Sequence, residues 1–411
     1  MIKTPLQTVI LVFLVLVGAS SACLAQELTT EVRPSWWTSL PTTPLFTAPA
    51  GDGELPAGWS VIGGPAKFEF VNDAKGRLEL RGTGSAPRNA FLTSPNSYGD
   101  FLLEFEVFME KDGGNSGVQI RSTVDGSRMF GYQIEIDPSD RAWSAGLYDE
   151  GRRGWLASLE DNEDAQEAFA PGAWNHYRIL AIGPRIRTWI NDVPAVDHLD
   201  FVDSRGRLGF QVHSGRCDVR WRNIRIADLG ERTDVKLLDA SQRSGFREIP
   251  EGGVASLDGG WVMDQEGVRL ESLEPIQDVP TVLTIKSTIR EGLLFIEMGD
   301  LVQGPGYRLK IPGPLGSSEK PGVIRILRFP DQLRVLVDDV PLVPGPPDIG
   351  GDFPLSISCS IDTDVTIHEV SINLPSSTES MWFKKIRESK QTPVDVPKGG
   401  STDEHVSELD P

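Results

Sequence analysis

The stretch Gly131-Tyr-Gln-Ile-Glu-Ile-Asp137 decides the fold, because polar and apolar side chains alternate along it. At the two-residue period of a β-strand, Gln133, Glu135 and Asp137 share one face, and the apolar residues between them share the other. A solvated sheet face is usually rich in Thr, Lys, Ser and Glu, whereas amides with paired carboxylates are more typical of a polar ligand site. The stretch therefore predicts a strand between a hydrophobic core and a functional face.

Two other stretches alternate in the same way, Asn115-Ser-Gly-Val-Gln-Ile-Arg121 upstream and Gly209-Phe-Gln-Val-His213 downstream. In each stretch, apolar side chains lie on one face of the strand and amide, guanidinium or imidazole groups lie on the other. Three such strands in one sheet would gather these groups on a single surface. The polar residues expected there are Asn115, Gln119, Arg121, Gln133, Glu135, Asp137, Gln211 and His213.

Length and composition narrow the class of protein. A chain of 411 residues exceeds one ordinary domain, so two domains with tails are expected. The 42 glycines and 30 prolines are spread through the chain, as in proteins with many turns between short strands. The net charge of −19 argues against nucleic acid and against binding an anionic membrane by charge, but not against a neutral ligand.

The N-terminal residues 1–25 are typical of a secretory signal peptide. Lys3 provides the positive charge, and the apolar run at 9–18 is too short for a typical membrane-spanning helix. The position three before Cys23 lacks the Leu of a lipobox, which favours cleavage over lipid anchoring at this cysteine. We expect a secreted or periplasmic protein with no membrane segment after signal removal.

Short alternating runs separated by turns continue from 56 to 229 without a helical period, which predicts a β-sandwich or jelly roll. Residues 259–375 repeat the pattern in the same order, and 186–196 aligns without gaps with 333–343. Longer loops and extra polar groups occur only in the first copy, so the site is expected there. The predicted organisation is a signal peptide at 1–25, a linker at 26–55, a first sandwich at 56–229, a linker at 230–258, a second sandwich at 259–375 and a disordered tail at 376–411.

Several motifs stand in a characteristic order, at 115–121, 131–137, 146–149, 174–175 and 209–213, the last followed by Arg222-Asn-Ile224. In this order they resemble the 3-keto-disaccharide hydrolase family, a secreted bacterial family with a concanavalin-like jelly roll related to laminin-G domains. The resemblance covers about 56–229, and the second sandwich looks like a divergent copy that inherits only the fold. It implies an all-β chain of two tandem concanavalin-like jelly-roll sandwiches, the first carrying the site.

The resemblance implies hydrolysis of glycosides that are already oxidised at C3 of the sugar. A C3 ketone acidifies the C2 proton, so that a base can remove it, the enolate expels the C1 oxygen, and water adds later. Such a site needs a general base, an enolate stabiliser, an acid for the leaving group and groups that hold the sugar. The expected ligand is a 3-keto-glycoside, and the chemistry requires a sugar oxidoreductase upstream to supply it.

The candidate catalytic residues are Glu135, Asp137 and His213. Two carboxylates on one strand face repel each other, which raises one pKa and allows an acid and a base near neutral pH. His213 is the rival base because its ordinary pKa already suits the task. Arg121 is expected to face the enolate oxygen. The other candidate substrate-binding residues are Asn115, Gln119, Gln133, Tyr148 and Gln211 for hydroxyl groups, with Trp155 or Trp143 for stacking on the sugar.

Other interpretations remain open at this stage. The same polar face would suit a carbohydrate-binding module or lectin-like protein without chemistry, a structural adhesion module, or a two-carboxylate glycosidase. The two acids could instead form a structural network with Arg121 and the arginines near Arg152. A divalent metal is also open, since Glu135, Asp137 and His213 offer oxygen and nitrogen ligands.

Overall fold

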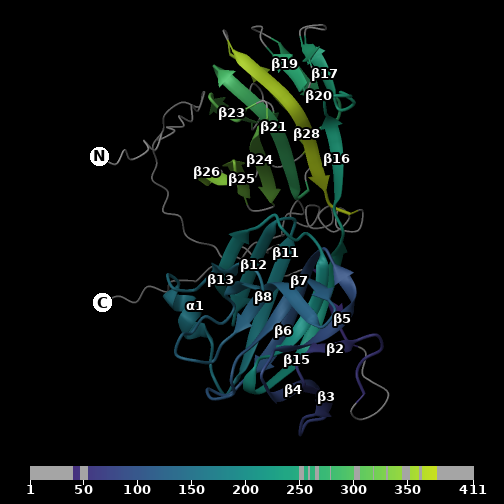
Figure 1. Ribbon diagram of the computed structural model, residues 1–411, viewed down its shortest axis with the longest axis vertical. Helices are drawn as coiled ribbons and strands as arrows, with labels where there is room; N and C mark the ends of the chain where they lie inside the picture. The colour runs from purple at the N-terminus through teal and green to yellow at the C-terminus, as the bar shows by residue number, and fades with distance from the viewer. Residues whose placement is uncertain are drawn as a thin grey trace, which may run out of the picture.

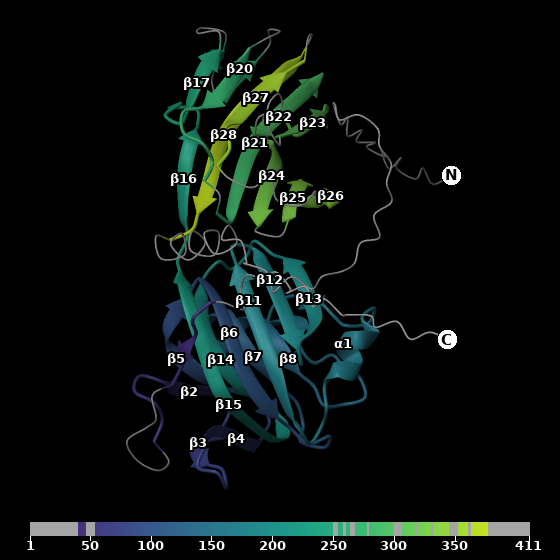
Figure 2. The same cartoon turned by 180° about the vertical axis from the view of Figure 1, so that it is seen from behind.

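The computed structural model describes residues 40–46, 54–249, 254–257, 260–263, 268–277, 279–299, 306–317, 319–329, 332–344, 352–360 and 363–376. Within these residues the chain is almost entirely β, with one short helix, α1 (Glu163–Ala168). The strands form two sandwiches that follow one another along the long axis of the molecule (Figures 1 and 2). No helix in this described part is long and apolar enough to cross a membrane.

The first sandwich is built from two antiparallel sheets. Sheet A has the order β13-β12-β11-β6-β15-β4-β3, with β1 paired to β15, and sheet B has the order β10-β9-β8-β7-β14-β5-β2. The strands of sheet A are β1 (Thr43–Pro44), β3 (Lys67–Asn72), β4 (Leu78–Ala86), β6 (Asp100–Phe108), β11 (Trp174–Ile182), β12 (Arg185–Ile190), β13 (Val193–Leu199) and β15 (Gly215–Gly230). Those of sheet B are β2 (Ser60–Gly63), β5 (Ala90–Tyr98), β7 (Ser116–Asp125), β8 (Arg128–Ile136), β9 (Leu147–Glu150), β10 (Gly154–Ala157) and β14 (Gly206–Val212).

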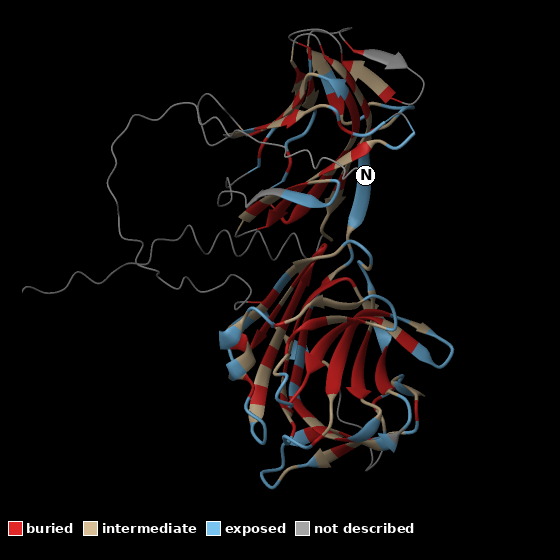
Figure 3. Cartoon of the chain, turned by 60° about the vertical axis from the view of Figure 1, so that its left-hand side comes forward, coloured by how far each residue is buried: buried red, intermediate tan, exposed pale blue. Residues whose placement is uncertain are grey.

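The apolar side chains of the strands pack between the two sheets, as the alternation predicts. Ile134 and Ile136 of β8 are fully buried there, together with Phe210 of β14 and Trp221 of β15. Burying one such side chain stabilises the fold by roughly 1.5–3 kcal/mol. Figure 3 shows the buried strands inside the first sandwich and exposed segments at its edges. The core therefore fixes which face of each strand turns away from it.

The second sandwich consists of sheets C and D. Sheet C has the order β18-β19-β28-β21-β24-β25-β26, with β16 paired to β28, and sheet D has the order β17-β20-β27-β22-β23. The strands of sheet C are β16 (Thr233–Leu238), β18 (Ala255–Leu257), β19 (Gly260–Met263), β21 (Thr281–Glu291), β24 (Gly322–Phe329), β25 (Gln332–Val337), β26 (Val340–Pro344) and β28 (Asp364–Leu374). Those of sheet D are β17 (Phe246–Ile249), β20 (Arg269–Ser272), β22 (Leu293–Gly299), β23 (Gly306–Pro312) and β27 (Leu355–Cys359).

The two sandwiches share one topology, which confirms the predicted tandem fold. β13-β12-β11-β6-β15 of sheet A corresponds in order to β26-β25-β24-β21-β28 of sheet C. Even the turn of the aligned hairpins is the same: φ is 48° and 67° at Asn191 and Asp192, and 48° and 65° at Asp338 and Asp339. Sheet B carries β9 and β10 beyond β8, whereas sheet D ends at β23, the counterpart of β8.

The domain boundaries differ from the predicted ones. β1 lies in the expected linker 26–55, because Thr43 and Pro44 pair with Ile226 and Arg225 of β15. β16, β17 and β18 lie in the expected linker 230–258 and belong to the second sandwich. These strands were missed because they are short and show little alternation. The predicted signal peptide and nearly all of the predicted disordered tail lie outside the described residues.

A third hydrophobic cluster lies where the two sandwiches meet. Its members come from the ends of strands in sheets A and C and include Leu102, Leu180, Ile182, Leu229, Val282, Leu327, Phe329 and Leu336. Arg185 of the first sandwich stacks on Phe329 of the second at 4.8 Å, and Arg334 of the second pairs with Asp197 of the first at 2.9 Å. The sandwiches are therefore packed against each other rather than merely tethered.

Candidate functional site

Pairing in sheet B puts several of the expected site residues in one row. Gln119 of β7 is opposite Gln133 of β8, which is opposite Tyr148 of β9, which is opposite Trp155 of β10. Glu135 lies two residues further along β8, on the same face as Gln133. The sheet thus presents amides, a carboxylate and aromatic rings side by side.

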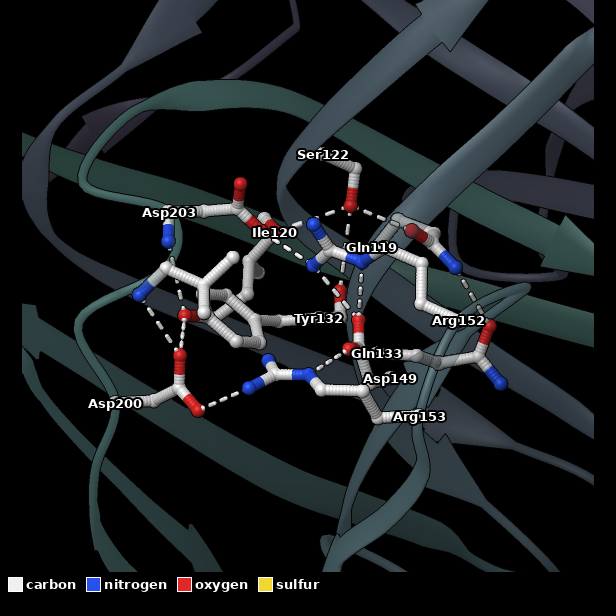
Figure 4. A network of polar contacts seen from close by, with 11 residues as sticks. Gln119, Ile120, Ser122, Tyr132, Gln133, Asp149, Arg152, Arg153, Asp200 and Asp203 are labelled. Atoms are coloured by element: carbon white, nitrogen blue, oxygen red, sulfur yellow. Dashed lines mark hydrogen bonds and ion pairs between the residues drawn. The ribbon is translucent and has the colours of Figure 1, made fainter.

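The amides are joined by hydrogen bonds, part of which Figure 4 shows. Gln133 Oε1 accepts from Gln119 Nε2 at 3.1 Å and from Gln211 Nε2 at 3.0 Å, and Gln133 Nε2 donates to Glu135 Oε2 at 3.2 Å. All four residues are at most 5 % exposed. Gln211 Oε1 is buried and has no hydrogen-bond partner among the described residues, so one acceptor on this face remains available.

Glycines on this face make room for the amides. A Cβ at Gly117 would stand 2.6 Å from the amide carbon of Gln133. A Cβ at Gly209 would likewise come within 2.5 Å of Met129 Sδ. Both glycines therefore allow long side chains to lie flat across the sheet.

Glu135 and Asp137 are linked by Arg141, a residue the sequence reasoning did not select. Arg141 Nη2 donates to Glu135 Oε1 at 2.7 Å, and Arg141 Nε donates to Asp137 Oδ2 at 2.7 Å. The carboxylate side chains are 6 % and 3 % exposed, whereas that of Arg141 is 41 % exposed. The signal available in the sequence was the four-residue spacing from Asp137 to Arg141 across the turn Pro138-Ser-Asp140.

Burial raises the pKa of Glu135, and the neighbouring charge of Asp137 raises it further. Hydrogen bonds from Asn115 and Gln133 and the charge of Arg141 oppose this rise. Asn115 Nδ2 donates to Glu135 Oε1 at 2.8 Å, so Glu135 accepts three hydrogen bonds in all. Its oxygens are therefore occupied by donors within the site.

Aromatic rings surround the guanidinium of Arg141. Its central carbon lies 5.3 Å from the ring centre of Trp143 and 5.1 Å from that of Trp155. The two tryptophans meet edge to face at 4.8 Å, and Tyr148 meets Trp155 at 5.1 Å. All three rings are partly exposed, so they offer an apolar surface next to a cation.

The expected position of Arg121 beside Gln119 is wrong. The pairing of β7 with β8 shifts between Ile120 and Thr123, and Arg121 has a φ of 46° at this bulge. Its guanidinium donates to Gly99 O, Gly183 O and Asp100 Oδ1 at 2.6–2.8 Å and is 1 % exposed. Arg121 therefore belongs to the junction with the second sandwich.

The arginines near Arg152 form ion pairs of their own, which Figure 4 shows beside the amides. Arg152 pairs with Asp149 and Asp203, and Arg153 pairs with Asp149 and Asp200. These contacts fasten the β9–β10 turn to the loop after β13. They do not involve Glu135 or Asp137, so the structural network considered for the acid pair is made by Arg141 instead.

His213 follows β14 and is only partly buried. Its Nδ1 donates to Ser214 O at 2.9 Å. Near it lies Glu150, which the sequence reasoning missed because it ends a short strand outside the quoted motifs. Burial raises the pKa of Glu150, while a hydrogen bond from Asn89 and the charge of His213 oppose the rise.

No three His, Cys, Asp or Glu side chains in the described part of the chain gather into a group that could hold a metal ion. Glu135, Asp137 and His213 are thus not brought together as a ligand set. Cys217 and Cys359 are buried in separate hydrophobic cores, so the two thiols are not joined to each other.

Sheet B thus combines buried amides and carboxylates with partly exposed tryptophans, groups that can hydrogen-bond and stack on a polar ligand. Residues 42–227 match the family model described as the 3-keto-alpha-glucoside-1,2-lyase-like domain. This match confirms the resemblance indicated by the sequence motifs and supports a carbohydrate-active or carbohydrate-binding function. It covers the first sandwich and ends before the second.

Solved structures with a similar arrangement of strands include carbohydrate-binding module CBM66 from Bacillus subtilis, with 18 % identity, 41 % of this chain and 93 % of that chain covered, and a TM-score of 0.31. A candidate glycosyl hydrolase from Parabacteroides distasonis is 16 % identical, and the match covers 44 % of this chain and 100 % of that chain with a TM-score of 0.29. A Bacillus subtilis protein with a galectin-like fold is 10 % identical, and the match covers 41 % of this chain and 89 % of that chain with a TM-score of 0.31. No curated protein sequence matches the chain.

Proposed function

We propose that the first sandwich cleaves glycosides of 3-keto sugars by elimination across C1 and C2, followed by addition of water. The description of the matching family supports this class of substrate. The observation that carries the proposal is the placement of Arg141, a partly exposed guanidinium held by two buried carboxylates next to aromatic surfaces.

Arg141 takes the role that the sequence assigned to Arg121. Loss of the C2 proton puts negative charge on the C3 oxygen, and a fixed cation facing that oxygen stabilises the enolate. Arg141 is fixed because Glu135 and Asp137 each accept one of its N–H groups. Its remaining N–H groups can face a ligand, since two-fifths of the side chain is exposed.

His213 is the base in this proposal. Its Nδ1 hydrogen is used by Ser214 O, so the neutral ring presents the lone pair of Nε2, which none of the described residues bonds. Glu135 is less suited to take the proton because three donors already occupy its oxygens. Glu135 and Asp137 are then positioning residues for Arg141.

The sugar is held by the amide row and the aromatic rings. Gln211 Oε1 lacks a partner and accepts from a sugar hydroxyl group. Trp155 and Tyr148 are partly exposed and provide a surface for the apolar face of a sugar ring. A sugar oxidoreductase in the same secreted or periplasmic setting supplies the C3 ketone.

A second candidate function is carbohydrate binding without chemistry. The full set of hydrogen bonds around Glu135 favours it, because a saturated network orients groups well but leaves few oxygens for proton transfer. Arg141 and the tryptophans would then recognise a sugar by stacking and by bonds to its hydroxyl groups.

The test is a cleavage assay on the purified protein with 4-nitrophenyl α-glucoside and its 3-keto counterpart, each with and without a chelator. We expect turnover of the 3-keto compound alone, lost in Arg141→Gln and kept in Arg225→Gln. The side chain of Arg225 extends from β15 of sheet A and contacts Thr42. Saturable binding of either glucoside without turnover would overturn the lyase proposal in favour of a binding module. Loss of turnover with chelator would add a metal to the mechanism.

A further inference from the structure

Sheet B curls until residues from its two ends meet. Asn89, just before β5, donates from Nδ2 to Glu150 Oε1 of β9 at 3.0 Å, although three strands separate β5 from β9 in the sheet. β2 also approaches β8 across the same face. The second oxygen of this carboxyl group, Oε2, has no hydrogen-bond partner among the described residues, so it is available to a ligand.

Asn89 holds His213 as well as Glu150. Its Oδ1 accepts from Ser214 N at 2.9 Å, and Ser214 O in turn accepts from His213 Nδ1 at 2.9 Å. One amide side chain therefore contacts the Glu150 carboxyl group directly and the His213 imidazole through Ser214, and the charge of His213 acts on Glu150. Each has one free heteroatom, Oε2 of Glu150 and Nε2 of His213.

The electrostatic setting of Glu150 bears on which of the two groups donates a proton. Burial raises the pKa of Glu150, so this carboxyl group keeps its proton to a higher pH than an exposed glutamate. The charge of a protonated His213 has the opposite effect on Glu150. Burial thus favours Glu150 as the proton donor of the two groups.

We propose that Glu150 is a further catalytic residue, the acid that protonates the leaving oxygen while His213 removes the C2 proton. The inference rests on the function proposed above and assigns its missing acid. The geometry that carries it is the position of Asn89, which bonds Glu150 directly and is linked to His213 through Ser214.

The step balances without any further reactant than water. In the elimination, the C2–H bond breaks and its proton goes to His213 Nε2, the electron pair forms the C1–C2 double bond, and the C1–O bond breaks. The departing oxygen takes the proton of Glu150 Oε2. Water then adds to the C1–C2 double bond. The oxygen of the water bonds to C1 while the Glu150 carboxylate takes a proton from this water, and His213 returns a proton to C2. Both groups are thereby restored.

Glu150→Gln tests the role of the acid, because the amide can still accept from Asn89 but cannot donate a carboxylic proton. Two 3-keto-glucosides are compared, one with a 4-nitrophenyl group, whose departure needs no acid, and one with a methyl group, whose departure does. We expect turnover of the methyl glycoside to fall by roughly 10²-fold, within the usual range for a general acid, and that of the nitrophenyl glycoside to change little. Glu160→Gln, at an exposed position, is the matched control and should behave like wild type.

A second measurement follows the C2 hydrogen of the methyl glycoside in deuterated water. If His213 still works in the Glu150→Gln protein, deuterium enters C2 of unreacted substrate while cleavage is slow. A Glu150→Asp protein should cleave the methyl glycoside at a rate between wild type and Glu150→Gln. If Glu150→Gln loses turnover equally on both glycosides, or loses none, the assignment of Glu150 is overturned while the proposed function stands. If the wild-type protein turns over neither glycoside, the proposed function and the assignment of Glu150 are overturned together.

Discussion

Arg232 and Asp100 form a buried ion pair at the junction of the two sandwiches, with Nη1 of the arginine 2.8 Å from Oδ2 of the aspartate. The side chains are 5 % and 1 % exposed. Asp100 Oδ1 also accepts from Arg121 Nη2 at 2.8 Å, and Arg232 bonds the backbone oxygens of Pro280 and Asn373. One carboxylate thus compensates two buried cations that hold the sandwiches together.

Asp100→Asn should destabilise the protein strongly, since Arg121 and Arg232 would lose the buried carboxylate that both of them contact. Removing one partner of a buried ion pair typically costs about 3–5 kcal/mol. The free energy of unfolding, measured in urea, should fall by this order. Asp125→Asn, at an exposed position on β7, is the control and should change it by less than about 0.5 kcal/mol. Equal stability of the two variants would show that the junction does not depend on this carboxylate.

Arg141→Lys should lower turnover of a 3-keto-glucoside by roughly 10²-fold, the usual cost of losing one group that stabilises an oxyanion. A lysine ammonium cannot reproduce the forked contact in which Nε meets Asp137 and Nη2 meets Glu135. Steady-state kinetics with purified protein would measure the effect. Arg225→Lys is the matched control, and a similar loss in that variant would point to a general effect on folding.

Much of the fold could be predicted because strand alternation is a local property. The period of two correctly placed Gln133 and Glu135 on one face and Ile134 in the core. The tandem fold followed from the repeated hairpin, whose turn needs a positive φ at Asn191 and Asp192 and at their counterparts. Short strands such as β1 escaped prediction, because two residues carry no measurable period.

The site was predicted only where it follows from alternation. A β-bulge shifts the register by one residue, and nothing in the sequence around Arg121 marks that shift. Arg141 lies in a loop, where no period applies. The contact of Asn89 with Glu150 depends on the curvature of the whole sheet, which arises from the packing of many strands. These are non-local properties, so they required the structure.

Trp155→Ala should weaken substrate binding more than it slows the chemical step. The ring stands 5.1 Å from the Arg141 guanidinium and 5.1 Å from Tyr148, at the edge of the polar row. A stacking or cation–π contact at a partly exposed ring contributes roughly 0.5–2 kcal/mol. We expect KM for a 3-keto-glucoside to rise by the factor that corresponds to this loss of binding free energy, with kcat nearly unchanged. Trp174→Ala, whose ring packs on Arg222 of sheet A, is the control; a fall in kcat alone for Trp155→Ala would contradict a binding role.

Glu150→Gln should also change how stability depends on pH. Burial raises the folded-state pKa of Glu150 above its ordinary value of 4.5, so the folded state holds this proton more tightly than the unfolded chain does. The resulting stabilisation is fully present below pH 4.5 and is lost as the pH rises through the folded-state pKa. Between pH 4.5 and 7.5, wild type should therefore lose more unfolding free energy than Glu150→Gln. Urea unfolding of both proteins at the two pH values measures the difference, and the contribution of Glu135 cancels because both proteins contain it. A greater loss of unfolding free energy in Glu150→Gln would mean that the folded protein holds Glu150 as a carboxylate, which is what the hydrogen bond from Asn89 alone would favour. Glu150 would then have no proton to give at neutral pH.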